Sequence, residues 1–263
     1  MNFKIGDMVT RRSYNHDVIF KITDISEKIV FLKGVNVRLY ADSVMEDLKI
    51  YDESLEKTFK DDKVFQENVQ EYMKFNRDEY FYLPGRILHI DGDKEYLERC
   101  LKFYKEADIL VYGKYEKEDQ MALNIKNHLE EIQPDVVVIT GHDAYYKKKG
   151  EKEELLAYKN TKNFINAIFE ARKYEKSPDK LIIIAGACQS NYEELIKAGA
   201  NFASSPRRIN IHALDPAIIA LALSLSDKSK EIDLLKILDK TKYGKNGLGG
   251  IITGGTMYIG YPR

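Results

Sequence analysis

A histidine and a cysteine each follow a strongly apolar run of the sequence, and together they suit nucleophilic catalysis. His142 comes just after the run ending at Thr140, and Cys188 comes 46 positions later, after the run ending at Ala185. The thiolate is the reactive form of cysteine, and a free thiol has a pKa of about 8.5. A nearby imidazole can accept this proton and later protonate a leaving amine. The pair therefore predicts a Cys-His dyad that attacks an acyl carbonyl.

Each of these residues also has an ordinary structural explanation when it is taken singly. A cysteine at a strand end is usually a small buried hydrophobe, and a histidine in a loop is usually a polar cap. Gly186 and Ala187 suit a tight turn that lets a substrate backbone approach closely. We expect backbone amides at the two loops, those of Cys188 and Asp143, to stabilise an oxyanion. The hypothesis depends on the fold bringing both side chains to one place.

The pattern from residue 84 onward predicts the scaffold that positions this pair. We expect strands over 86–90, 109–112, 135–140 and 181–185, and helices over 94–105, 117–132, 161–174 and 192–198. This βαβα order is typical of an α/β fold, a mainly parallel sheet with helices on both faces. Continuously apolar strands belong at the centre of such a sheet, so 135–140 and 181–185 should be neighbours. Because ligands bind beyond the carboxyl ends of the strands, His142 and Cys188 should share one edge.

The first fifty residues have a different pattern, in which short alternating apolar stretches are separated by turn-forming clusters. They predict a small all-β barrel domain over 1–50, for which recruitment of substrate proteins is one open role. Residues 51–83 are expected to form a linking helix, because their apolar residues are mostly three or four positions apart. Pro84 and Gly85 then mark the turn that begins the α/β domain over 84–263.

Composition excludes several other classes of function. Lysine and arginine total 41 against 42 acidic residues, and this balance argues against binding to nucleic acid or an anionic membrane. The apolar runs are too short to cross a bilayer, and the chain starts without the pattern of a secretory signal. With two cysteines and no paired metal-ligand spacing, neither a disulfide scaffold nor a metal is indicated. We therefore expect a cytoplasmic protein without a cofactor.

Several longer motifs resemble the sporulation-specific YabG peptidase family of spore-forming Firmicutes. They are GDMV at 6–9, HIDGD at 89–93, ITGHDAY at 139–145, GACQS at 186–190, AGANFASSP at 198–206 and NIHALDP at 210–216. This resemblance spans nearly the whole chain. It implies a cysteine endopeptidase that processes spore coat and related spore proteins in the cytoplasm of the mother cell, at the forming spore coat.

The two strand ends are also similar to those of the caspase, legumain and clostripain group, since caspases have a histidine about 50 residues before Gln-Ala-Cys. This similarity implies a caspase-like fold, with His142 as the base and Cys188 as the nucleophile. The group usually has glycine directly after the histidine, whereas here Asp143 follows it and Gly141 precedes it. The source of the second oxyanion-hole amide therefore stays open.

Carboxylates near the same expected edge suggest a basis for substrate specificity. Asp91 and Asp93 follow the strand at 86–90, where the caspase-like group places part of its pocket for the residue before the cleaved bond. A carboxylate there would favour arginine or lysine through a charge-assisted hydrogen bond. The alternative is that Asp93 caps the following helix and Asp91 shapes the turn.

Several other residues are candidates for a role at the expected edge or in the core. Asp143 either orients the imidazole or only ends the strand, and Ser204 and Ser205 either line the substrate cleft or form a turn. His212 is a rival base, and Cys100 is expected in the core.

Two other functions compete with the peptidase. One is a spore coat scaffold or binding protein in which Cys188 and His142 are inert, and the other is a thioesterase or amidase of the same fold. A peptide-sized open cleft would favour the peptidase, a closed apolar tunnel the thioesterase, and a buried sulfur without a cleft the scaffold. The lysine run at 147–149 is either a solvated loop or a site of self-cleavage.

Overall fold

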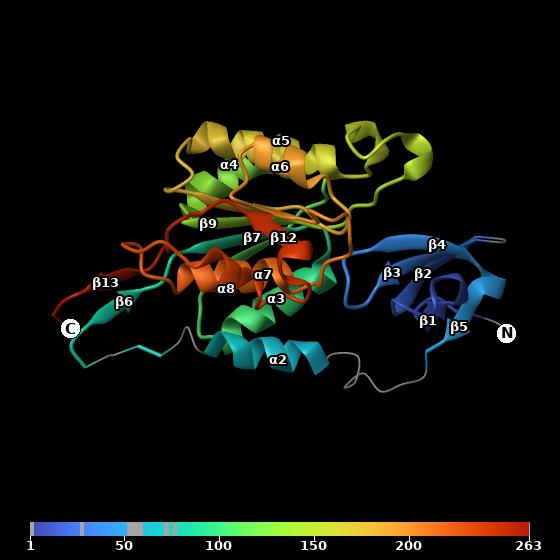
Figure 1. The fold of residues 1–263 in the computed structure, drawn as a ribbon, viewed down its shortest axis with the longest axis horizontal. Helices are drawn as coiled ribbons and strands as arrows, with labels where there is room; N and C mark the ends of the chain where they lie inside the picture. The colour runs from blue at the N-terminus through green and yellow to red at the C-terminus, as the bar shows by residue number, and fades with distance from the viewer. Residues whose placement is uncertain (1–2, 27–28, 52–59, 71–73, 76–77, 263) are drawn as a thin grey trace.

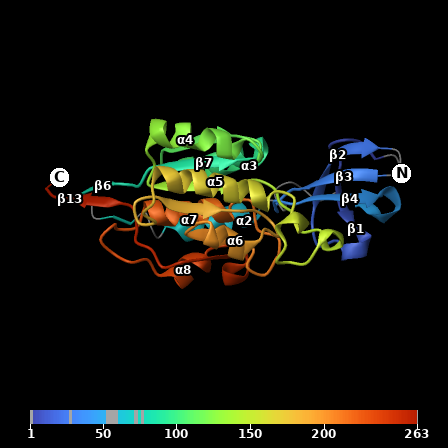
Figure 2. The same ribbon diagram turned by 90° about the horizontal axis from the view of Figure 1, so that it is seen from above.

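Two main sheets organise the protein, whose computed structural model describes residues 3–26, 29–51, 60–70, 74–75 and 78–262. An antiparallel sheet near the N-terminus lies at one end of the molecule, beside a larger α/β body (Figure 1). Figure 2 shows the same arrangement from above, with the C-terminus at the opposite end.

The N-terminal sheet has the strand order β4-β3-β2-β1-β5, with antiparallel pairing between neighbours. Its strands are β1 (Met8–Arg11), β2 (Phe20–Ser26), β3 (Ile29–Gly34), β4 (Tyr40–Val44) and β5 (Leu48–Ile50). Alternate residues such as Phe20, Ile22 and Leu32 are buried on one face. The all-β character expected of this segment is confirmed, whereas closure into a barrel stays a prediction.

The segment expected to be a linking helix contains more than one kind of structure. Helix α2 (Lys60–Val69) falls within it, and the positions 52–59, 71–73 and 76–77 of the expected helix lie outside the described residues. The C-terminal end of the expected linking helix was predicted wrongly, because residues there form strand β6 (Phe81–Leu83), which pairs with β13 (Tyr258–Gly260). Such pairing depends on residues far along the chain and leaves no local signal. The boundaries between the expected domains stay predictions.

The large sheet has the strand order β12-β11-β10-β9-β7-β8, and its pairs are parallel except for the antiparallel edge strand β12. Its strands are β7 (Ile87–Asp91), β8 (Val111–Tyr115), β9 (Val136–Thr140), β10 (Ile182–Ala185), β11 (Phe202–Ser204) and β12 (Leu248–Gly250). The mainly parallel α/β sheet is thus confirmed, and β9 and β10 are its two central strands.

Helices cover both faces of this sheet (Figure 1). Helices α4 (Met121–Ile132), α5 (Thr161–Tyr174) and α6 (Tyr192–Lys197) lie on one face, and α3 (Lys94–Glu106), α7 (Asp215–Ser224) and α8 (Leu234–Leu238) lie on the other. Successive residues of β9 alternate between the two cores, with Val138 in one and Ile139 in the other. This double burial explains why the central strands are apolar without interruption. Among the described helices, none has the length and apolarity needed to cross a bilayer.

The four expected strands are found within one residue of their predicted boundaries except for one, and the helix expected at 117–132 begins later, at Met121. The strand expected at 109–112 is found at Val111–Tyr115. Asp108 has a left-handed backbone with φ of 55°, and the amide of Ile109 donates to the carbonyl of Tyr104. Helix α3 ends at Glu106, but the turn that closes it uses the Ile109 amide, so the strand begins two residues later than expected.

We expect Ile184→Ala to lower the free energy of unfolding by about 3 kcal/mol, because it opens a cavity in the centre of the sheet. Ile184 is 1% exposed, whereas Leu123 on α4 is 70% exposed. Leu123→Ala should therefore change stability by less than about 0.5 kcal/mol. Urea unfolding of both variants measures the difference, and equal effects would contradict the proposed central position of β10.

Candidate active site

The register of the two central strands brings the two candidate catalytic residues to the same level. Strand β9 pairs with β10 so that Ile139 lies opposite Ala185. His142 lies three residues beyond Ile139, and Cys188 lies three residues beyond Ala185. Both residues therefore leave the sheet at the same carboxyl-end edge, and the expected adjacency of their strands is confirmed.

Asp143 ties together the loops that carry His142 and Cys188. Its carboxylate accepts hydrogen bonds from the Asn160 amide at 2.7 Å and from Ser190 Oγ at 2.9 Å, and also from Thr161 Oγ1. The carboxylate is thus directed to these donors rather than to the imidazole. Burial raises the pKa of Asp143 to about 6, although the hydrogen bonds oppose this rise. The carboxylate of Asp143 thus links the two loops, and its role toward His142 stays a prediction.

The turn before Cys188 depends on Gly186, as the sequence predicts. Gly186 has φ of +100°, and a Cβ atom there would come within 2.7 Å of Leu195 Cδ1. The Ala187 amide then donates to Ser190 Oγ at 2.9 Å. This arrangement fixes the backbone on both sides of Cys188. The use of the Cys188 and Asp143 amides as oxyanion donors stays a prediction.

The imidazole of His142 is buried between aromatic and acidic side chains. The Tyr40 ring, from the N-terminal sheet, lies 3.9 Å from it between ring centroids. Nδ1 is 3.7 Å from Glu118 Oε1, and Nε2 is 3.6 Å from Asp93 Oδ2. Nε2 is without a hydrogen-bond partner in the described part of the chain. Two carboxylates are therefore placed to stabilise a protonated imidazole.

Cys188 is fully buried and lies beneath the N-terminal sheet, in the same core as Phe20 and Leu32. The Ile211 amide donates to Sγ at 3.2 Å. Burial raises the pKa of Cys188 to about 12, while the Ile211 backbone and the charge of Arg38 oppose the rise. Within the described residues the thiol and the His142 imidazole are not hydrogen-bonded to each other. In this state the sulfur is a protonated thiol, and the N-terminal sheet covers the edge at which the sequence places it.

Asp91 is paired with an arginine of the N-terminal sheet's β3–β4 loop. Arg38 Nη1 donates to Asp91 Oδ2 at 2.7 Å, and the Asp93 amide donates to Asp91 Oδ1 at 3.0 Å. Burial raises the pKa of Asp91, but the Arg38 charge and the His89 hydrogen bond outweigh it and hold the value at about 2. Asp91 therefore shapes the turn, as the structural alternative expects, and also binds a cation.

Asp93 likewise has both a structural and an electrostatic contact. Its Oδ1 accepts from the amides of Glu95 and Tyr96 and so caps helix α3. Its Oδ2 pairs with Lys33 Nζ, also from the N-terminal sheet, at 2.6 Å. The capping expected from the sequence is thus observed.

The two serines lie near the Cys188 loop but are differently engaged. Ser205 Oγ accepts from the Gln189 amide at 2.9 Å and donates to the Ile209 carbonyl. Ser204 is buried at the end of β11, and its Oγ has no hydrogen-bond partner among the described residues. Ser205 therefore acts within the fold, and a substrate-binding role for either serine stays a prediction.

The rival base lies in a different environment. The ring of His212 packs edge-on against Phe65, and its Nδ1 accepts from the Leu214 amide at 3.2 Å. Burial, together with the nearby Arg99 charge, holds the pKa of His212 well below its ordinary value.

A buried group of His89, Asp91 and Cys100 has the residue types of a metal site. Arg38 lies among them, with Nη2 3.5 Å from Cys100 Sγ in addition to its pair with Asp91. A fixed guanidinium charge at this point disfavours a bound cation. Cys100 is buried as expected.

Four residues in or beside the site escaped the sequence-based reasoning, namely Lys33, Arg38, Tyr40 and Glu118. The first three come from the N-terminal sheet and its β3–β4 loop. The signal for Arg38 was a charged residue within an otherwise apolar, alternating stretch, VNVRLY at 35–40. Its partner could not be identified, because Asp91 lies on a different sheet.

We expect Asp143→Asn to alter the pH dependence of stability. Because the pKa of Asp143 is raised from 3.8 to about 6, its contribution is fully present below about pH 4 and is lost as pH rises through 6. The wild-type free energy of unfolding should fall by up to about 3 kcal/mol relative to the variant between pH 4 and 7. Denaturant titrations across this range measure it, and a constant difference would exclude the shift.

Comparisons with known proteins identify the family of this chain. The family model described as YabG peptidase U57 matches residues 4–262. The chain is 43% identical to the sporulation-specific protease YabG of Bacillus subtilis (strain 168), in an alignment of 286 residues covering 100% of this chain and 99% of that protein. The chain therefore belongs to the YabG peptidase family.

Proposed function

We propose that this chain is a cysteine endopeptidase in which Cys188 is the nucleophile and His142 is the general base. The observation that carries the proposal is the equal offset of both residues from paired positions on β9 and β10. The same edge carries Asp93 and Glu118, whose carboxylates lie 3.6 and 3.7 Å from the two nitrogens of the His142 imidazole. This distribution suits a base that becomes cationic during the reaction.

The reaction begins when His142 accepts the Cys188 proton and the thiolate attacks a peptide carbonyl. The imidazolium then protonates the leaving amine, and an acyl-enzyme remains on the sulfur. Water activated by His142 hydrolyses this thioester. Asp93 and Glu118, each within 3.7 Å of an imidazole nitrogen, stabilise the cation in the interval. The Cys188 and Asp143 amides are our candidates for the oxyanion donors.

Cleavage after basic residues is supported by the state of Asp91. Its carboxylate is buried, ionised and bound to a guanidinium in the present structure. A substrate arginine or lysine in the same position would gain a charge-assisted hydrogen bond.

For substrates, we propose spore coat and related spore proteins of the mother cell, and the chain itself as a further substrate. The support is the relative's description as a sporulation-specific protease.

A second candidate is a non-enzymatic spore coat scaffold, and the buried sulfur favours it. A sulfur sealed beneath another sheet is expected of an inert protein, but it is equally expected of an enzyme whose site is occupied. The peptidase hypothesis predicts that removal of the Cys188 thiol abolishes proteolytic activity, whereas the scaffold hypothesis predicts no such activity to lose.

We expect Cys188→Ala and His142→Ala to abolish cleavage of an unstructured arginine-rich protein, each by at least about a thousandfold. Leu123→Ala, at an exposed position of α4, is the control and should retain cleavage. Mass spectrometry of the products measures the cut sites. Full proteolysis by both folded variants would refute the dyad, whereas the absence of cleavage by the wild type as well would support the scaffold.

We expect Asp91→Asn to reduce kcat/KM for cleavage after arginine by about tenfold or more, because hydrogen bonds between charged groups contribute about 1.5–3 kcal/mol. Cleavage after uncharged residues should change less. Asp119→Asn, at an exposed carboxylate, is the control. An unaltered site preference in folded Asp91→Asn protein would remove this residue from the specificity pocket.

A further inference from the structure

The loop between β3 and β4 lies across the candidate site as an additional short strand. Val37 forms an antiparallel bridge with His212. On either side of it, the Ala213 amide donates to the Asn36 carbonyl at 2.9 Å, and the Arg38 amide donates to the Ile211 carbonyl at 3.4 Å. Ile211 is also the residue whose amide contacts Cys188 Sγ. The loop backbone is therefore paired with the segment that lies directly against the candidate nucleophile.

Arg38 extends from this loop into a fully buried pocket of the α/β body. Nη1 donates to Asp91 Oδ2 at 2.7 Å, and Nε and Nη2 donate to the Ala213 carbonyl at 3.2 and 2.9 Å. The planar guanidinium thus donates to a carboxylate from one nitrogen and to a carbonyl from the other two. A lysine ammonium cannot reproduce this geometry. The Arg38 amide and the Cys188 thiol also meet at the same acceptor, the Ile211 carbonyl, at 3.4 and 3.6 Å. The pocket is thus shaped for an arginine next to the sulfur.

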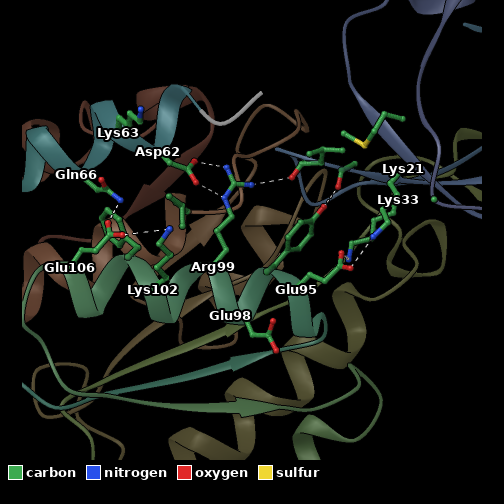
Figure 3. A pocket seen from close by; sticks show the side chains of 17 residues that line it. Lys21, Lys33, Asp62, Lys63, Gln66, Glu95, Glu98, Arg99, Lys102 and Glu106 are labelled. Atoms are coloured by element: carbon green, nitrogen blue, oxygen red, sulfur yellow. Dashed lines mark hydrogen bonds and ion pairs between the residues drawn. The ribbon is translucent and has the colours of Figure 1, made fainter. Parts of the chain in front are cut away.

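Helix α3 holds the loop backbone in this extended form. Tyr96 Oη donates to the Val37 carbonyl at 2.8 Å, and Arg99 Nη1 donates to the Val35 carbonyl at 3.1 Å. Figure 3 shows Arg99 between Asp62 and this loop, and Lys21 and Lys33 beside Glu95. These groups line a cavity of about 1000 Å³ between the N-terminal sheet and α3. The loop is therefore bordered by open space on one side.

Arg38 belongs to the N-terminal sheet's β3–β4 loop, but its guanidinium is buried in the α/β body. Desolvation of a charge costs several kcal/mol unless the charge is paired, so this burial calls for an explanation. Main-chain pairing combined with a side chain in a specific pocket is how proteins recognise extended peptides. Residues 36–38 combine these two features, because their backbone pairs with the segment around His212 and the Arg38 side chain enters the Asp91 pocket.

Resting on the proposed function, we infer that residues 36–38 occupy the substrate-binding site as an internal substrate mimic and keep the enzyme latent. Arg38 stands where the arginine before the cleaved bond of a substrate would lie. Ile211 and Ala213 are then the backbone-binding residues for an extended polypeptide. Activity requires that the loop be displaced by an arginine-containing protein segment.

The test measures access to the thiol separately from catalysis. Purified full-length wild type, Arg38→Ala and Arg38→Ala with Cys188→Ala are treated with iodoacetamide, and peptide mass spectrometry distinguishes Cys188 from Cys100. The same proteins are assayed on a fluorogenic peptide with one arginine. We expect Arg38→Ala to raise both the Cys188 labelling rate and kcat/KM by at least about tenfold, and the double variant to be inactive.

Lys21→Ala is the matched control, because Lys21 also bridges the N-terminal sheet to α3, through an exposed pair with Glu95. It should leave both rates within about twofold of wild type. If Arg38→Ala does not fold, Arg38→Gln combined with Asp91→Asn leaves no unpaired buried charge, and its Cys188 should still label faster than in wild type.

The outcomes separate the two proposals. Faster labelling without cleavage by any variant would mean that the loop covers the thiol but would refute the peptidase, and with it a mimic of a peptidase substrate. Unchanged labelling in a folded Arg38 variant overturns the mimic, as does a wild type that cleaves as fast as Arg38→Ala. In the latter case the peptidase still stands if Cys188→Ala is inactive.

Discussion

The parallel pairing of β9 with β10 is the constraint on which the rest of the site depends. Both strands are buried on two faces, so their register is fixed by the cores on either side and not by the loops that follow. The loops can then carry polar residues without disturbing the sheet. Asp143 joins them through Ser190 and the start of α5, which limits their relative movement. A rigid sheet edge therefore supports the reactive groups.

The N-terminal sheet completes the site instead of standing apart from it. Lys33 pairs with Asp93, Arg38 with Asp91, and Tyr40 covers His142. Each of these two cations from the N-terminal sheet meets a carboxylate of the α/β body, so separation of the two parts would leave the carboxylates without their cationic partners. The shared core around Cys188 and Ile211 adds apolar contacts to these pairs. Docking of the sheet and closure of the site are consequently one event.

The central strands and the helices between them could be predicted from sequence, because 135–140 and 181–185 are apolar without interruption and the flanking segments are amphipathic. The expected strand ends also placed His142 and Cys188 on one edge. The covering of that edge could not be predicted. Arg38 meets Asp91 only after the two sheets dock, and such a contact has no local pattern. The late start of β8 similarly depends on how α3 ends at Asp108.

Burial of the sulfur also has a chemical consequence outside proteolysis. Oxidation by peroxide proceeds through the thiolate and requires access, so a protonated thiol sealed from solvent reacts slowly. Cys188 meets both conditions while the N-terminal sheet lies over it. Peroxide is therefore expected to convert Cys188 to sulfinic acid only slowly for as long as the N-terminal sheet covers it.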